Sequence, residues 1–263
     1  MTLFTGTVIR HPVQIQIGFP VIPQAGSSLE FFILNQWLTE CDTKHTGCRP
    51  SKPERQNFLP TRLIEVGEEG SKAVRLIETA SMAQGSYVAL SHPWGSGPHF
   101  RTTVTNLGRH KSGIAISELP ATFKDAVKTT RALGQHYLWV DSLCIIQGPG
   151  GDFNIESTRM ESVFSSAYCI IAACRAKSQQ DGFLALRPPR AFVAIQQSGP
   201  EPFFICEAAD NFSSHVLGSY MNGRGWVMQE RALARRTIYF TDRQVYWECG
   251  DRIRCETLAA MSK

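Results

Sequence analysis

The fold of this chain is decided by the stretch Tyr87-Val88-Ala89-Leu90-Ser91-His92-Pro93-Trp94-Gly95. Its first five residues form an almost continuous apolar run, which is typical of a strand that is covered on both faces of a sheet. The residues from His92 onwards end this run abruptly. We therefore expect a buried strand over residues 87–91, followed directly by a loop.

Two more buried strands follow, and each comes after a predicted helix. Apolar residues at the i, i+3, i+4, i+7 spacing indicate a helix over residues 120–134, with Pro120 near its start and Gly134 just past its end. Apolar strands are then predicted at residues 137–140 and, after a second amphipathic helix, at 169–173. This alternation is typical of a parallel sheet with right-handed crossovers. The predicted fold class is therefore α/β, with a parallel sheet and flanking helices.

The remaining segments indicate additions to this core. Residues 62–66 and 73–77 flank a Gly/Glu turn and predict an N-terminal β-hairpin, and residues 237–240 and 245–248 predict a C-terminal one. A helix is expected to begin at Leu29. The expected organisation has three parts. Residues 1–28 are a variable leader, and residues 256–263 are a tail. Between them, residues 29–255 form one domain, with a core at about 87–187 and 224–249 and an insertion at about 188–220.

Composition and charge exclude several classes of protein. The net charge of +4 comes from 27 basic and 23 acidic residues that are scattered along the chain, whereas a nucleic-acid binder concentrates basic charge on one face. No apolar run approaches the roughly 18 residues of a membrane span, and residues 1–12 do not have the pattern of a secretory signal. Eight cysteines without such a signal favour reduced thiols and a cytoplasmic protein.

Three spaced blocks of sequence resemble the fungal heterokaryon incompatibility (HET) domain family. They are YVALSHPWG at residues 87–95, LPATFKDA and YLWVDSLCIIQ between residues 119 and 147, and RGWVMQER at residues 224–231 followed by YWEC at 246–249. Long spaced blocks are far more specific than one short motif. The resemblance covers roughly residues 30–255. His92 stands where the family more often has Tyr, and Gly148 replaces an acidic residue that is often found there.

The resemblance implies a role in non-self recognition, a form of innate immunity that ends in programmed cell death. Its expected partners are further copies of the chain or a sensor protein. Many family members carry long C-terminal regions, so this chain is expected to be either a short member or a fragment of a longer one.

The HET family is also similar in its proposed fold to TIR domains, which are flavodoxin-like modules. Some TIR domains hydrolyse NAD with a glutamate in a helix just after a tryptophan-containing motif, and Trp226 and Glu230 are similar in type and position. This implies an alternative function as an NAD(P) glycohydrolase, with NAD as a substrate, Glu230 as the catalytic residue and Trp226 in the binding site. The competing interpretation of Glu230 is a surface glutamate that pairs with one of three arginines: Arg231, Arg235 or Arg236.

Polar and aromatic side chains follow the first two parallel strands. Ligands bind outside the carboxyl ends of strands in open α/β sheets, so these side chains are expected to converge on one crevice. The candidate ligand-binding residues are Ser91, His92, Trp94, Asp141 and Ser142. Trp94 could instead be a packed turn residue, and Asp141 could cap neighbouring backbone amides.

The residues Cys41, His45 and Cys48 have a spacing that is typical of metal ligands. A closed structural zinc site needs four ligands, and this segment supplies three. Cys249 or Cys255 could supply the fourth if the fold brings the ends of the chain together. The alternative is a set of buried thiols with a hydrogen-bonded histidine.

Overall fold

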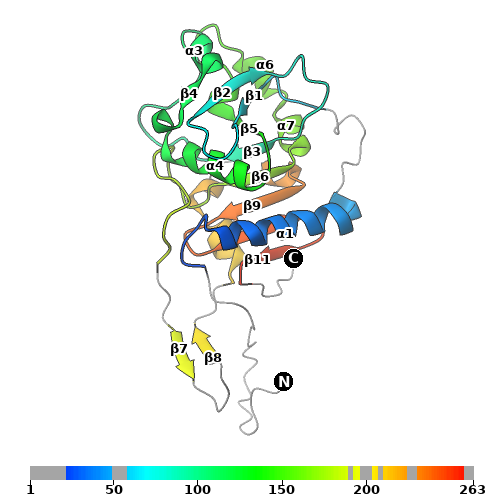
Figure 1. Cartoon of the computed structure of the whole chain (residues 1–263), viewed down its shortest axis with the longest axis vertical. Coiled ribbons are helices and arrows are strands. Elements are labelled where there is room, and N and C mark those ends of the chain that lie inside the picture. Colours follow the sequence, from blue (N-terminus) through cyan, green and yellow to red (C-terminus); the bar gives the residue numbers. More distant parts are fainter. Residues whose placement is uncertain are drawn as a thin grey trace.

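The computed structural model describes residues 22–48, 58–188, 192–195, 203–206, 210–223 and 230–257. Nine of its strands form one sheet in the order β11-β10-β9-β6-β3-β5-β1-β2-β4 (Figure 1). In chain order, the bounds of these strands are β1 Arg62–Glu65, β2 Ala73–Glu78, β3 Val88–Ser91, β4 Ile114–Ala115, β5 Tyr137–Val140, β6 Cys169–Ala172, β9 Arg236–Phe240, β10 Val245–Cys249 and β11 Ile253–Cys255.

The centre of the sheet is parallel, as the alternation of strands and helices predicts. Strand β3 pairs in parallel with β5 on one side and with β6 on the other, and β6 pairs in parallel with β9. Every residue of β3 and β6 is buried. The unbroken apolar runs in the sequence reflect this position, because helices or other chain segments cover both faces of these strands.

Antiparallel strands extend the sheet at both ends. The predicted N-terminal hairpin is β1–β2, and β1 pairs antiparallel with β5, so the hairpin is continuous with the central sheet. The predicted C-terminal hairpin is β9–β10, which β11 extends by one more antiparallel strand. Strands β7 (Phe192–Ile195) and β8 (Phe203–Cys206) form a separate antiparallel pair. They fall within the predicted insertion.

Six α-helices with defined bounds accompany these strands in the described residues. Their bounds are α1 Ser28–Lys44, α3 Leu107–Ser112, α4 Ala121–Ala132, α5 Asp141–Cys144, α6 Phe153–Ser157 and α7 Met160–Ser166. Helix α4 buries Phe123, Ala126 and Val127, as its apolar spacing predicts. Helix α1 begins where Ser27 accepts a hydrogen bond from the backbone N–H of Glu30, a typical N-cap contact. Figure 1 shows α1 beside β9 and β11.

Two apolar cores lie against the sheet. The larger one contains Trp139 of β5 and Phe164 of α7, whose rings pack edge to face. The smaller one is formed where residues 210–223 pack on the C-terminal strands, and Phe212 contacts both Tyr239 and Tyr246. This segment contains a π-helical turn at Ser213–Leu217 and a 3-10 turn at Tyr220–Gly223.

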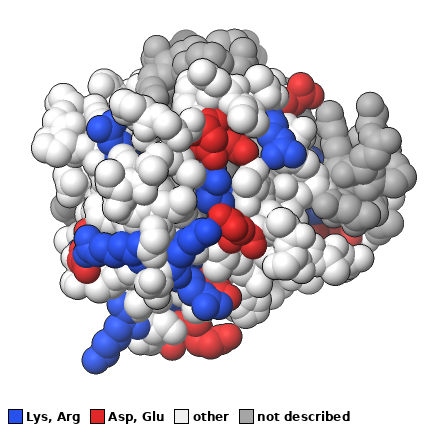
Figure 2. Space-filling model, turned by 90° about the horizontal axis from the view of Figure 1, so that it is seen from above, with Lys and Arg blue, Asp and Glu red and all other residues white. Residues whose placement is uncertain are grey.

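Charged side chains of both signs lie next to each other on the face shown in Figure 2. Around α3 and β2, for example, Arg109 pairs with Glu118, and Lys111 pairs with Glu78 at 2.5 Å. The scattered charge of the sequence is thus partly neutralised by local pairing. Among the described helices, none combines the length and the apolar character that crossing a bilayer requires.

Candidate functional site

The carboxyl ends of β3 and β6 meet at a point where the chain changes direction. From β3 the chain continues to β5 on one side, whereas from β6 it continues to β9 on the other side. Connections that diverge from neighbouring parallel strands leave a crevice between them, and this is where open α/β sheets bind ligands. The topology therefore places the candidate site beside Ser91, the last residue of β3.

Ser91 and Glu230 are in direct contact at this point. The buried Ser91 hydroxyl donates a hydrogen bond to the carboxylate of Glu230, and the sulfur of Met221 lies 3.7 Å from the same hydroxyl. Glu230 is half-buried and lies in a helical stretch whose described residues are 230–233. This contact joins two residues that are 139 positions apart in the sequence.

The three arginines that follow Glu230 have partners of their own. Arg231 forms a two-pronged ion pair with Glu248, in which both nitrogen–oxygen distances are 2.9 Å. Arg235 donates to the backbone carbonyl of Ala167, and Arg236 pairs with Asp42. Each of the three arginines thus has a contact besides any with Glu230, and the role of Glu230 stays a prediction.

A small cavity of about 10 Å³ adjoins the Ser91–Glu230 contact, which is about the room that one water molecule needs. It is far smaller than the roughly 300–1,000 Å³ of most ligand pockets, so a ligand at this contact would lie mostly outside it. Its lining combines hydroxyl, carboxylate and guanidinium groups with an apolar floor: Ser91, Ile170, Ala172, Met221, Glu230, Arg231, Thr237 and Tyr239.

Arg231 and Tyr239 are site residues that the sequence analysis missed. Both bind Glu248, and the Tyr239 hydroxyl donates to its carboxylate at 2.6 Å. The hydrogen bond to Glu248 raises the pKa of Arg231 above its ordinary value, and burial raises that of Tyr239. Arg231 adjoins a candidate residue in the sequence, whereas nothing near Tyr239 or Met221 distinguishes them from core residues.

A second group of predicted residues converges on Asp141. One of its carboxylate oxygens accepts a hydrogen bond from Trp94 Nε1 at 2.7 Å, and the other accepts one from the backbone N–H of Ser142 at 2.6 Å. Nδ1 of His92 lies 3.9 Å from the carboxylate. Asp141 therefore fixes the half-buried indole of Trp94 and also binds the backbone amide of the next residue in α5.

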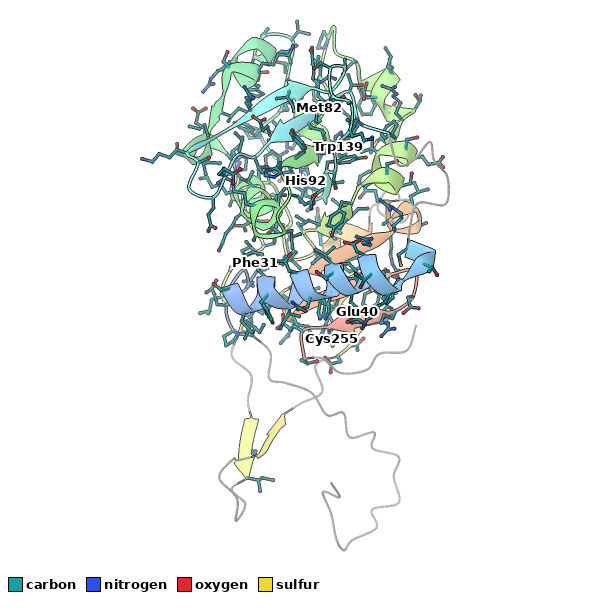
Figure 3. The ribbon with its side chains drawn as sticks, turned by 45° about the vertical axis from the view of Figure 1, so that its right-hand side comes forward. Phe31, Glu40, Met82, His92, Trp139 and Cys255 are labelled. Carbon is teal, nitrogen blue, oxygen red and sulfur yellow. The ribbon has the colours of Figure 1, made fainter. Side chains whose placement is uncertain are left out.

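His92 and Ser142 are enclosed by protein on this side of the sheet. The imidazole of His92 packs edge-on against the ring of Phe123 in α4, with 5.0 Å between centroids. Figure 3 shows His92 inside the upper part of the molecule. Ser142 is fully buried, and its hydroxyl lies 3.5 Å from Nε2 of Gln179.

The strand-end residues thus form two adjacent groups, one around Glu230 and one around Asp141. Ser91 belongs to the first group and His92 to the second, so the two groups are joined through consecutive residues. Trp226, the remaining candidate, lies outside the described residues. That all these side chains bind one ligand stays a prediction.

The residues with the spacing of metal ligands come together elsewhere, at the end of β9 that lies away from the two strand-end groups. Cys249, the last residue of β10, lies opposite Arg236, the first residue of β9. The ligand atoms of four buried residues lie within 4.8 Å of one another. We name this group the cysteine–histidine cluster, and its members are Cys41, His45, Cys48 and Cys249. Cys255 is not among them, because its sulfur faces Asp210 and Thr257.

Comparison with models of protein families gives a match. The family model described as "Heterokaryon incompatibility protein (HET)" matches residues 87–230, which is more than half of the 263 residues. The matched segment begins at the residue before β3 and ends at Glu230, so it includes both partners of the Ser91–Glu230 contact. No curated protein and no solved structure matches the chain significantly.

Proposed function

Because the chain belongs to the heterokaryon incompatibility (HET) family, we propose that it acts in fungal non-self recognition, as a module whose assembly triggers growth arrest or programmed cell death. The observation that carries this proposal is the family match across residues 87–230, which spans the parallel strands β3, β5 and β6. A death signal of this kind requires a surface through which copies of the chain, or a sensor protein, can associate.

Strands β7 and β8 offer such a surface. They stand apart from the nine-stranded sheet (Figure 1), and Val193 and Ile195 of β7 are 65% and 42% exposed. These two residues are two positions apart, so they lie on the same face of the strand. A two-stranded ribbon also has open edges, which favour pairing with another strand. Self-association through this ribbon would bury apolar surface that is now exposed.

The proposal is tested by induced expression of the full chain in a fungal cell, with growth as the readout. The double variant Val193→Glu/Ile195→Glu is expected to sediment as a monomer and to lose toxicity. Val104→Glu, at another exposed apolar position, is the matched control and should keep both assembly and toxicity. Full toxicity of a strictly monomeric double variant would contradict the assembly mechanism.

A second candidate function, favoured by the Ser91–Glu230 contact, is that of an NAD(P) glycohydrolase that kills by depleting the cofactor. Cleavage of the nicotinamide–ribose bond passes through an oxocarbenium-like state, and water then adds to the ribose carbon to give ADP-ribose. A carboxylate beside the ribose stabilises the positive charge or orients the sugar hydroxyls. The Ser91 hydroxyl would hold the Glu230 carboxylate in a fixed orientation for this task.

The position of the contact agrees with this chemistry. Glu230 lies at the carboxyl ends of the parallel strands, where open α/β sheets bind ligands. The adjoining cavity is smaller than a sugar ring, so a dinucleotide would lie outside it, towards the loops that follow the strands. NAD consumption by the purified chain, compared with that of Glu230→Gln, tests this function. The two functions are compatible, because assembly could complete an active site.

A further inference from the structure

We propose that this protein binds one structural zinc ion through its cysteine–histidine cluster: Cys41, His45, Cys48 and Cys249. This site lies at the opposite end of β9 from the strand-end site, and the proposal does not depend on either proposed function. Three thiolates and one imidazole are a set of soft and borderline ligands that selects zinc over magnesium or calcium.

The distances in the cluster are those of a four-coordinate site that is nearly closed. A tetrahedral zinc ion with Zn–S and Zn–N bonds of about 2.3 and 2.1 Å separates its ligand atoms by roughly 3.6–3.8 Å. Nδ1 of His45 lies 3.5 Å from Sγ of Cys249, which already agrees with that separation. The other pairs lie within 4.8 Å, so shifts of about 1 Å would complete the tetrahedron.

His45 is oriented as zinc-binding histidines usually are. One ring nitrogen, Nδ1, faces the sulfur of Cys249, while the other, Nε2, lies 3.4 Å from a carboxylate oxygen of Asp251. A carboxylate behind the second nitrogen fixes the tautomer and the orientation of a metal-bound imidazole. Asp251 is itself bound by Arg252 at 2.6 Å. Nε2 of His45 forms no hydrogen bond in this structure, so Asp251 is the nearby carboxylate that would bind it once the imidazole holds a metal ion.

The four ligands come from two ends of the chain that the fold brings together. Cys41 lies in the last turn of α1, His45 directly follows this helix, and Cys48 ends the 3-10 turn Thr46–Cys48. Cys249 arrives more than 200 residues later, at the end of β10. Figure 3 labels Glu40, the neighbour of Cys41 on α1, and Cys255 on β11 below it.

At Gly250 the backbone passes close to the cysteine–histidine cluster. A Cβ atom added to Gly250 would lie 3.3 Å from the sulfur of Cys48, so a side chain here would crowd the cluster. Cys144 and Cys169 belong to the same main core as the cluster cysteines but lie outside the cluster.

A zinc ion here would connect α1 to the strand that supports the strand-end site. Cys249 directly follows Glu248, the partner of Arg231, and Arg231 adjoins Glu230 in the chain. Because the ligands come from distant segments, the free energy of zinc binding would contribute directly to the free energy of folding. The zinc ion would therefore fix β10 and stabilise the fold without taking part in chemistry.

The test is the metal content of the full chain, purified under reducing conditions without chelator, measured by mass spectrometry of the elements. One zinc per chain is expected, and Cys249→Ser should lower this to near zero. Cys174→Ser, at a buried cysteine outside the cluster, is the matched control and should keep the metal. His45→Cys should also keep it, because zinc accepts four thiolates as readily.

A second measurement does not depend on the folding of any variant. Replacement of the bound metal of the wild-type chain by Co²⁺ should give the intense charge-transfer and d–d absorption bands of a tetrahedral site with three thiolates. The proposal would be overturned if reduced, metal-free wild-type protein gave no such bands on addition of Co²⁺. Full metal content in a folded Cys249→Ser variant would also overturn it, as would a disulfide between two cysteines of the cluster in freshly purified protein.

Discussion

Arg187 donates hydrogen bonds from one guanidinium nitrogen to both carboxylate oxygens of Glu256, at 2.6 and 2.8 Å, and both side chains are only 1% exposed. Its other terminal nitrogen binds Glu30 at 2.6 Å, so one arginine joins α1, the segment after the central sheet and the segment after β11. Glu256 in addition accepts hydrogen bonds from the backbone N–H groups of Ile22 and Val245.

Replacement of Arg187 by Met should strongly destabilise the fold. The variant leaves two carboxyl groups buried without their cation, and breaking a buried ion pair in this way costs about 3–5 kcal/mol. Urea denaturation at pH 8 should show this loss. Arg159→Met, which removes an exposed arginine that pairs with Glu156, is the control and should change the free energy of unfolding by no more than about 1 kcal/mol. Equal losses in the two variants would contradict the role of Arg187.

The stability of the protein should depend on pH through Glu256. Burial raises the pKa of Glu256 from 4.5 to about 7, although the charge of Arg187 opposes the shift. Between these pH values the folded chain keeps a proton that the unfolded chain has released. The stabilisation is therefore fully present below about pH 4.5 and is lost as the pH rises through about 7. It amounts to roughly 3 kcal/mol.

The measurement is the free energy of unfolding of the wild type and of Glu256→Gln between pH 5 and 8. The free energy of unfolding of the wild type, relative to that of Glu256→Gln, should fall as the pH rises. This fall should level off above pH 7. Glu69→Gln, at an exposed position, serves as the control and should run parallel to the wild type. A difference between wild type and Glu256→Gln that stays constant across this range would contradict the raised pKa.

The parts of the fold that could be predicted are those with a local signal. Strands β3 and β6 are covered on both faces, so each is a continuous apolar run that can be read without knowing its neighbours. Helix α4 carries its signal in the spacing of Phe123, Ala126 and Val127. Strands β4 and β11 escaped prediction because they have two and three residues, too few for any periodicity.

The parts that could not be predicted depend on contacts between distant segments. Ser91 was a candidate through its place at a strand end and Glu230 through a family resemblance, but their contact spans 139 positions. Likewise, three ligands of the cysteine–histidine cluster are close in sequence, whereas the choice between Cys249 and Cys255 depends on the pairing of β10 with its neighbours. No local pattern encodes such a pairing.

Asp141→Ala should release the indole of Trp94. The substitution removes the acceptor of the 2.7 Å hydrogen bond from Trp94 and the carboxylate that binds the backbone N–H of Ser142. We expect a loss of about 1–2 kcal/mol in the free energy of unfolding, because one half-buried indole N–H and one backbone N–H lose their acceptor. Asp141→Asn keeps an acceptor and should lose less. The same order should appear in the iodide quenching of tryptophan fluorescence, and equal behaviour of the two variants would contradict this role of Asp141.

Glu230→Gln should abolish the hydrolysis of NAD if the strand-end site is a glycohydrolase centre. Glutamine keeps the size of the side chain and an acceptor for the Ser91 hydroxyl but cannot stabilise a positive charge on the ribose, so a loss of at least about 100-fold in kcat is expected. Ser91→Ala leaves the carboxylate in place but removes one hydrogen bond that orients it, which should cost about tenfold. Glu69→Gln is the control and should keep wild-type turnover.

The assay measures nicotinamide release by chromatography, at low protein concentration and under crowding that favours assembly. Circular dichroism of each variant excludes unfolding as the cause of a loss. If the wild type turns over NAD and Glu230→Gln does so equally fast, Glu230 is not the catalytic residue. If no protein turns over NAD under either condition while induced expression still arrests growth, the glycohydrolase proposal is wrong. The chain then acts through assembly, and the Ser91–Glu230 contact serves to hold residues 230–233 against the end of β3.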